Sequence, residues 1–361
     1  MEIFSFDQTE ANQQKFQVRE HLLDNLKKRF SLHGYQQIRT STFEPYELYS
    51  NQIGTIPQAS MIKVIDPSGK VLVLRPDATI PVTKEVAGKY DSFTGHIRYF
   101  YVLDVFRQSF YGNGGKERTQ AGVECFGEKS AAIDAEVIAL AIQTLQDIGA
   151  THFKIEIGHA NFFKQLLAEI ALPEEAMEQL KATIQAKNIA DIGPLLESFA
   201  VDPSLVEKVS QIPFLYGHPK EVMERAQNVL VNEKMRAELN SLWDVYEMLC
   251  TYGVGEHIVF DLGLINHMNY YSDIIFQGFV EQVARPVLMG GRYDRLAEQF
   301  GEAIPAIGFA SDVDALLAAA ANDRAIARPA DITVVYETSK LTQALALTSR
   351  LRDEGGIAPL P

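Results

Sequence analysis

The sequence predicts an α+β fold in which an antiparallel sheet is flanked by helices and interrupted by a helical insert. Strand-like runs follow one another through short turns, and few of them alternate with helices as they would in a parallel sheet. Between residues 172 and 253 strand patterns are absent and charged helical segments dominate. The length of 361 residues predicts two or three domains.

The first half of the chain supplies one long helix, a hairpin and the longest strands. Over residues 10–33, Leu22, Leu26 and Phe30 recur at helical spacing, and Gly34 follows where a helix end favours a residue that tolerates positive φ. The other predicted elements are a strand at 35–40, a hairpin at 61–74 with its turn at 66–69, strands at 97–106 and 120–126, a helix at 132–148 and a strand that starts at Phe153.

The second half returns to strands after the insert and closes with a short tail. Its predicted elements are strands at 258–262, 270–279 and 286–289, a helix after Gly308, a strand at 332–336 and a helix at 339–352. We therefore expect a discontinuous domain formed by residues 1–171 and 254–322, a helical insert at 172–253, and a separate tail at 323–361.

Composition narrows the class of protein. With 33 Lys+Arg against 47 Asp+Glu the formal charge is −14, which disfavours nucleic acid as the main partner because phosphate binding needs clustered cations. Cys125 and Cys250 lack the spacing of a disulfide scaffold or a zinc site and fit a reducing compartment. Charged residues interrupt the first 23 positions, and no apolar run is long enough to span a bilayer. We expect a cytoplasmic protein with no membrane partner.

Glycine pairs and histidines give no specific catalytic signal. The loop at 112–116 lacks the P-loop spacing, so a plain connection between strands is favoured over a phosphate-binding loop. Gly290-Gly291 is typical of a turn, and the eight histidines show no metal-ligand spacing. No serine or cysteine has a nucleophile context, and the sequence predicts neither a metal nor a cofactor.

A more informative feature is a set of polar residues in strand-like apolar runs. Gln120 and Glu124 lie four apart on one strand and therefore share a face. Asp77 and Thr79 follow the hairpin, and Tyr270 and Tyr271 begin another strand. Each residue alone is more often an ordinary surface or hydrogen-bonded side chain. Together they predict only a polar pocket for a small cationic ligand.

Several ordered motifs resemble the catalytic domain of the histidyl-tRNA synthetase family, from about residue 10 to residue 316. The resemblance implies a class II synthetase sheet with a dimer interface near the first helix. The motifs are Thr42-Phe43-Glu44-Pro45, Leu74-Arg75-Pro76-Asp77-Ala78-Thr79, Val105-Phe106-Arg107, Gln120-Ala121-Gly122-Val123-Glu124, Tyr270-Tyr271, Gly290-Gly291-Arg292-Tyr293-Asp294 and Pro305-Ala306-Ile307-Gly308-Phe309-Ala310.

The departures from the synthetase motifs concern the nucleotide. Arg107 is followed by Gln108 and Ser109 where the family has a glutamate two places later, Asp312 replaces a glycine, and the arginines that hold the triphosphate and catalyse adenylation fall at Ala315 and Asn266. Cationic groups stabilise the charge that develops on a polyphosphate, so we expect no adenylation and assign no catalytic residue.

The amino-acid pocket of the family is retained. The resemblance implies that Asp77 and Thr79 hold the ammonium of a bound histidine and that Gln120 bridges its ammonium and carboxylate. Glu124 and Tyr271, with Tyr270 beside them, would bracket the imidazole nitrogens, and Arg107 would meet the carboxylate. Asp77 replaces the synthetase glutamate with a shorter side chain.

These features resemble one branch in particular, the regulatory subunits of ATP phosphoribosyltransferase. The resemblance implies a non-catalytic subunit that pairs with a short-form catalytic subunit in a hetero-oligomer, self-associates as a dimer and mediates feedback by L-histidine in the first step of histidine biosynthesis. The tail at 323–361 resembles only the start of an anticodon-binding domain, which implies no tRNA partner.

Three alternatives stay open at this level. One is an active histidine-adenylating synthetase-like enzyme, and another is a module that senses tRNA. In the third, the chain serves only the assembly of the catalytic subunit, and histidine acts elsewhere.

Overall fold

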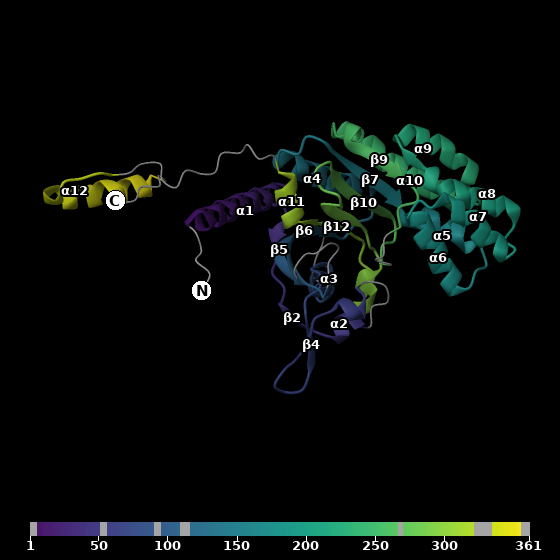
Figure 1. Cartoon of the computed structure of the whole chain (residues 1–361), viewed down its shortest axis with the longest axis horizontal. Helices are drawn as coiled ribbons and strands as arrows, with labels where there is room; N and C mark the ends of the chain where they lie inside the picture. The colour runs from purple at the N-terminus through teal and green to yellow at the C-terminus, as the bar shows by residue number, and fades with distance from the viewer. Residues whose placement is uncertain are drawn as a thin grey trace. The chain divides into compact units, whose positions relative to one another are not determined.

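The computed structural model describes residues 6–50, 56–89, 95–108, 116–265, 270–320 and 334–354. The chain divides into two compact units (Figure 1), Leu23–Ala320 and a smaller one that combines Met1–Leu22 with Ala321–Pro361. In the smaller unit the described residues form the start of helix α1 (Phe6–Leu32), a short turn η7 (Thr338–Lys340) and helix α12 (Leu341–Asp353). All of the candidate site residues lie in the larger unit.

A large sheet organises the larger unit. Among the described residues it has nine strands in the order β1-β5-β6-β12-β11-β10-β7-β9-β8. Their bounds are β1 Gln36–Gln37, β5 Ile97–Phe106, β6 Glu117–Phe126, β7 Phe153–His159, β8 Tyr216–Gly217, β9 Ile258–Asp261, β10 Ile274–Val280, β11 Leu288–Arg292 and β12 Ala306–Asp312.

The predicted class is confirmed, with one refinement of strand direction. The central strands pair antiparallel, whereas β1 pairs with β5 and β7 pairs with β9 in parallel, so the sheet is mixed. A parallel pair needs a long crossover, and the chain between β7 and β9 supplies it with helices. The helical stretch is thus the connection that lets β9 return beside β7.

A second sheet holds the predicted hairpin. Its order is β2-β4-β3, with β2 at Phe43–Pro45, β3 at Lys63–Ile65 and β4 at Val71–Leu74, all antiparallel. The hairpin turn is closed by Asp66, whose Oδ1 accepts the backbone N–H groups of Ser68 and Lys70 at 2.8 and 2.9 Å. Gly69 supplies the positive φ of 86° that the turn requires.

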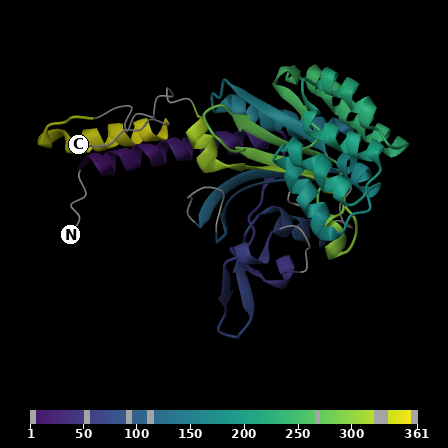
Figure 2. The same cartoon turned by 45° about the vertical axis from the view of Figure 1, so that its right-hand side comes forward.

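Helices cover both faces of the large sheet. In Figures 1 and 2, α4 and α10 lie on one side, and the small sheet with α2 and α3 lies on the other. The remaining helices of the larger unit are α2 Glu47–Ser50, α3 Thr79–Ala87, α4 Ala131–Asp147, α5 Ala160–Ala168, α6 Glu174–Gln185, α7 Ile189–Ser198, α8 Pro203–Gln211, α9 Pro219–Ala226, α10 Glu233–Thr251 and α11 Val313–Ala319, with 3-10 turns at Gln58–Ser60, Ile212–Phe214, Gln227–Val229, Gly255–His257 and Leu296–Phe300.

The segment expected to be purely helical contains one short strand. Residues 172–253 form α6 to α10 as the sequence indicates, but β8 pairs with β9 and extends the large sheet by one strand. Two residues are too few for a recognisable strand pattern. The expected domain boundaries at 171, 253 and 322 stay a prediction.

Near the C-terminal end the predicted helix after Gly308 is present but starts later than expected, and the predicted strand at 332–336 is not seen in its described residues. Gly308 lies inside strand β12, and the helix begins only at Val313, with Asp312 accepting the N–H of Ala315 as its N-cap at 2.9 Å. Strand β12 is buried on both faces, so its apolar run lacks the alternation that marks a half-buried strand. In the predicted strand 332–336, the three described residues from Val334 onward form no strand.

Parts of three motifs lie outside the described residues. These are most of the glycine-rich loop, the serine that follows Gln108, and the stretch from Asn266 to Asn269. No helix among the described residues combines the length and apolarity that a bilayer span requires.

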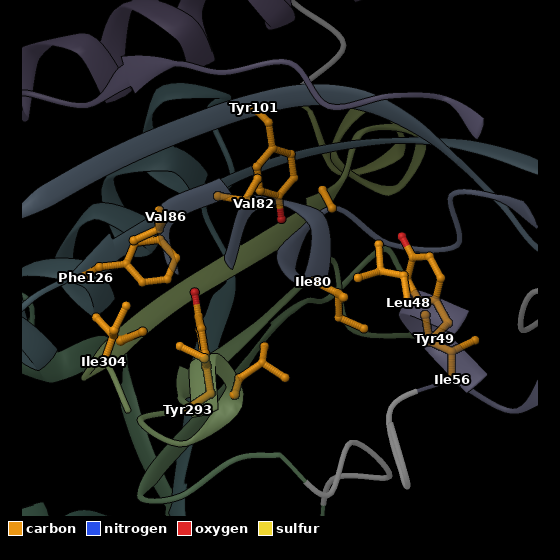
Figure 3. Packing of buried hydrophobic residues seen from close by; sticks show 14 of the residues in the cluster. Leu48, Tyr49, Ile56, Ile80, Val82, Val86, Tyr101, Phe126, Tyr293 and Ile304 are labelled. Atoms are coloured by element: carbon orange, nitrogen blue, oxygen red, sulfur yellow. The ribbon is translucent and has the colours of Figure 1, made fainter. Parts of the chain in front are cut away.

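A hydrophobic cluster forms where α3 packs against the large sheet (Figure 3). It includes Ile80, Val82, Tyr101, Phe126 and Tyr293, all at most 2% exposed. The hydroxyl groups of the two tyrosines point into the same region from opposite sides. A polar site is therefore built into an otherwise apolar core.

Arg75 ties this region to the edge of the sheet. Its side chain is 5% exposed, and its Nε and Nη1 donate to the backbone oxygens of Asp104 and Thr40 at 2.7 and 2.9 Å. Its own carbonyl accepts the N–H of Phe106 at 3.0 Å. The segment that leads into the site is thus fixed along β5.

Candidate functional site

Glu124 is the centre of the site. It lies on β6 and is 1% exposed, opposite Gly308 of the neighbouring strand β12. A Cβ on Gly308 would overlap the Glu124 carboxylate, so the glycine leaves the space that the carboxylate fills. Gly122 gives Tyr101 room in the same way two residues earlier on β6.

Three hydroxyl groups donate to the Glu124 carboxylate. Thr79 Oγ1 and Tyr101 OH donate to Oε1 at 2.7 and 3.4 Å, and Tyr293 OH donates to Oε2. Burial raises the pKa of Glu124 to about 7, helped by the nearby charge of Asp77, while the hydroxyl groups act in the opposite direction. Glu124 is therefore poised to exchange a proton or to accept from a ligand N–H near neutral pH.

Asp77 is a second buried carboxylate in this pocket. It precedes α3, is 5% exposed, and its Oδ1 accepts the N–H of Ile80 at 3.2 Å. Its Oδ2 is buried and has no hydrogen-bond partner among the described residues. Burial raises the pKa of Asp77 to about 6, against the opposing charge of Arg107. An unpaired buried acceptor of this kind is costly unless a ligand satisfies it.

Tyr270 and Tyr271 form an aromatic wall. Their ring centroids are 4.7 Å apart, and the Tyr270 ring lies 5.8 Å from that of Tyr293 in an edge-to-face arrangement. Burial raises the pKa of both hydroxyl groups, so both stay neutral donors. The backbone oxygen of Tyr271 accepts from Lys164 Nζ at 2.9 Å, which fixes the wall to α5.

Arg107 and Gln120 lie at the rim. Arg107 follows β5 directly, and its Nε donates to the carbonyl of Pro76 at 2.9 Å, one residue before Asp77. Gln120 is half-buried on the Glu124 face of β6, opposite Leu103 and Asp312. The fold thus brings Asp77, Thr79, Glu124 and Arg107 together through hydrogen bonds and charge interactions, whereas Gln120 joins them by its strand position.

Tyr101 and Tyr293 are functional candidates that the sequence pattern missed. Tyrosines in apolar strands are usually core residues, so nothing in the local sequence set these two apart. The alternation of side chains along a strand could have indicated Tyr101. It pairs with Gly122, and Gly122 lies two residues before Glu124 and therefore on the same face of the sheet. A tyrosine across from a glycine on a carboxylate-bearing face has room to turn its hydroxyl toward that carboxylate.

Asp312, which the resemblance predicts to replace a motif glycine, lies at the end of β12. Its Oδ2 accepts from Arg118 Nη1 at 3.0 Å and from Arg285 Nη1 at 2.6 Å, while Oδ1 caps α11. Ala315, where the family's arginine would fall, is buried on that helix. This single carboxylate therefore pairs with two arginines and also caps the helix.

A separate cavity of about 530 Å³ lies elsewhere in the larger unit. It is lined by Lys154, Tyr216, Gly217, His218, Tyr246, Cys250, Gly253, Gly255, Glu256, Ile258 and Val259. None of the predicted site residues is among them. The side chains around Glu124 carry the more specific chemistry, with two buried carboxylates and three hydroxyl donors, so we take them as the functional site.

The fold and the site together define a class of protein. The family model of histidyl-tRNA synthetase matches residues 8–316. A crystal structure of a histidyl-tRNA synthetase from Nostoc sp. PCC 7120 superposes with a TM-score of 0.80 at 20% identity, covering 96% of this chain and 83% of that one, which supports the fold alone. The chain is therefore a member of the histidyl-tRNA synthetase-like proteins.

More similar relatives identify the branch. A regulatory subunit of ATP phosphoribosyltransferase from Oceanobacillus iheyensis is 44% identical over 350 residues, covering 97% of this chain and 86% of the relative. One from Acetivibrio thermocellus is 36% identical, covering 93% and 81%. A Bacillus halodurans structure described as an ATP phosphoribosyltransferase regulatory subunit/histidyl-tRNA synthetase has a TM-score of 0.84 at 28% identity, covering 100% and 90%. The chain belongs to the family of ATP phosphoribosyltransferase regulatory subunits.

Proposed function

We propose that this chain is a non-catalytic subunit that senses L-histidine and is required by a short-form catalytic ATP phosphoribosyltransferase subunit in the first step of histidine biosynthesis. Its main support is the pair of buried carboxylates, Asp77 and Glu124, in a pocket with tyrosine hydroxyl groups. The names of the relatives support the partnership.

The chemistry of L-histidine matches this pocket group by group. The unpaired Oδ2 of Asp77 would accept from the ligand ammonium, together with Thr79. The Glu124 carboxylate would accept an imidazole N–H, and the neutral Tyr271 hydroxyl would donate to the other ring nitrogen, with Tyr270 packed behind it. Arg107 and Gln120 at the rim would meet the ligand carboxylate.

Feedback then requires a difference in affinity between two states of the complex. L-Histidine shifts the equilibrium only as far as it binds one state better than the other, typically by about 1–3 kcal/mol. We propose a dimer of this chain within a hetero-oligomer, located in the cytoplasm, with no tRNA partner and no adenylation of histidine. The two arginines held by Asp312 support the last point.

Calorimetry of the full chain with L-histidine tests the binding site. We expect saturable binding that Asp77→Asn and Glu124→Gln each weaken at least tenfold, because each removes a charged acceptor. Glu117→Gln is the matched control, since Glu117 is exposed on the same strand as Glu124. Equal affinity in all variants would place histidine elsewhere.

A coupled assay tests the role. The catalytic subunit is assayed alone, with this chain, and with the Glu124→Gln variant, each at increasing L-histidine. We expect activity only with this chain present and weaker inhibition with the variant. Inhibition that is unchanged in the variant supports a pure assembly role instead, and histidine-dependent exchange of pyrophosphate into ATP by this chain alone would support a synthetase.

A further inference from the structure

A second cluster of ionisable side chains lies under the helices on the other face of the large sheet. His159 ends β7, Asp273 directly precedes β10, and Glu238 lies on α10. The register pairs His159 with Ile274, which brings Asp273 beside the imidazole. His159 Nε2 is 2.6 Å from Asp273 Oδ1 and 3.2 Å from Glu238 Oε2.

The imidazole of His159 is fully enclosed and unsatisfied. The residue is 1% exposed, and neither ring nitrogen makes a hydrogen bond of normal geometry among the described residues, although Nε2 lies at ion-pair distance from Asp273 Oδ1. Asp273 Oδ1, which faces the ring, is also without one. Buried polar atoms normally have partners, and here three unsatisfied atoms belong to two adjacent side chains. One atom each from His159, Glu238 and Asp273 lie within 4.8 Å of one another.

The charges around this cluster are out of balance. Lys129 Nζ contacts Asp273 Oδ2 at 2.5 Å and Asp294 Oδ2 at 3.7 Å. Arg292 pairs with Asp134 and Asp294. With Glu238 included, two cations face four carboxylates, so the connected network has a net charge of −2 while the imidazole is neutral.

The excess of negative charge is visible at the far end of the network. Burial raises the pKa of Asp134 to about 6, and the charges of Asp273 and Asp294 act in the same direction. A buried network that lacks two positive charges is unfavourable by itself. A divalent cation would bring it to neutrality.

We propose that His159 Nε2, Glu238 Oε2 and Asp273 Oδ1 form a binding site for one divalent transition metal ion, with Zn²⁺ as the best match. Imidazole and carboxylate are zinc ligands, and three protein ligands leave a fourth position for water. Tetrahedral bonds of about 2.0–2.2 Å place donor atoms roughly 3.3 Å apart, which needs only small side-chain rotations here. Lys129 stays on Asp273 Oδ2 and orients the carboxylate.

Glu238 on α10 is the member of the cluster that reaches solvent. The Glu238 side chain is 23% exposed, whereas those of His159 and Asp273 are 0% and 4% exposed. Metal can thus enter past Glu238, and Glu238 can be changed with little effect on the core. This site is independent of the histidine pocket.

Zinc titration of the full chain tests the proposal. The protein is purified without a histidine tag, stripped with a chelator and titrated with Zn²⁺ in buffer free of L-histidine, which itself binds zinc. We expect one Zn²⁺ per chain, and visible d–d absorption from bound Co²⁺. Glu238→Gln should weaken Zn²⁺ binding at least tenfold, while Glu233→Gln, exposed on the same helix, should leave it unchanged.

Two further variants separate a metal ligand from a charged hydrogen-bond pair. His159→Gln should abolish the Co²⁺ spectrum, and Lys129→Met should weaken Zn²⁺ binding because it removes the cation that orients the Asp273 carboxylate. No Zn²⁺ uptake by the stripped chain, or uptake that Glu238→Gln and His159→Gln leave unchanged, would overturn the proposal. The cluster would then be an ion pair of a protonated imidazole.

Discussion

The large sheet carries two buried groups of acidic side chains on its opposite faces, and they are stabilised in opposite ways. On one face Glu124 is surrounded by hydroxyl groups of Thr79, Tyr101 and Tyr293, and burial raises its pKa to about 7. On the other, Asp273 forms an ion pair with Lys129, and Arg292 pairs with Asp134 and Asp294. Hydroxyl groups leave a carboxylate able to change its protonation state, whereas cations fix its charge.

The two groups meet at the end of strand β11, where neighbouring residues contribute to different groups. Arg292 and Tyr293 are consecutive, so their side chains leave opposite faces of the sheet. Arg292 Nε and Nη2 donate to Asp134 Oδ1 at 2.9 and 2.5 Å, while the Tyr293 hydroxyl donates to Glu124. Neutral donors leave Glu124 able to accept from a ligand N–H, whereas on the other face Lys129 and Arg292 compensate part of the buried negative charge.

Removal of Arg292 should give the largest effect. Arg292→Met leaves the buried Asp134 without its cation and removes one of the two cations beside Asp294, so we expect a loss of about 3–5 kcal/mol in the free energy of unfolding. Urea unfolding at neutral pH measures it. Arg295→Met is the control, because Arg295 forms an exposed pair with Glu298 and should change stability by less than about 1 kcal/mol. If both variants lost a similar free energy of unfolding, the buried ion pairs of Arg292 would have no special role in stability.

Gly308→Ala should give the next largest effect, and on the hydroxyl-lined face only. The added methyl group meets the Glu124 carboxylate, and overpacking of this kind costs about 1–3 kcal/mol. Loss of L-histidine binding should accompany the loss of stability.

Gly193→Ala is the matched control for Gly308→Ala. Gly193 lies in α7 with open space around its Cα, so alanine should be neutral or slightly stabilising there. An equal loss in the two alanine variants would show that Gly308 has no special role.

The pH dependence of stability should give an effect no larger than that of Gly308→Ala. Burial raises the pKa of Glu124 from 4.5 to about 7, so the folded state favours the protonated form. The associated stability is fully present below about pH 4.5 and is lost as the pH rises toward about 7. Glu124→Gln, which cannot ionise, should reduce this decline by about 1–3 kcal/mol in urea unfolding across that range. An identical decline in wild type and variant would assign the effect to other groups, Asp77 first.

Local patterns predicted the elements that are half-buried or bounded by clear turns. The hairpin closed by Asp66 and the long strand β5 were predicted with bounds close to those observed. Strand β12 was missed because burial on both faces removes the alternation of polar and apolar residues. Strand β8 was missed because two residues carry no pattern.

The site was predictable only where a motif carried it. Asp77, Thr79 and Glu124 come from the resemblance to synthetase motifs, and the fold places them in one pocket. The roles of the seven predicted residues in binding histidine stay a prediction. The cluster of His159, Glu238 and Asp273 combines residues from three separate elements, so no spacing along the sequence could have indicated it.

Arg75 has a consequence for how this protein associates with others. A sheet edge is a template on which a strand from another chain can align, and such growth leads to swapped or fibrous assemblies. Along β5, the Arg75 guanidinium donates a hydrogen bond to the backbone oxygen of Asp104. The Arg75 carbonyl oxygen accepts the backbone N–H of Phe106. These two backbone groups of β5 are therefore not available to pair with a strand from another chain. Any partner that docks here must recognise side chains and shape, which favours a defined stoichiometry over open-ended growth.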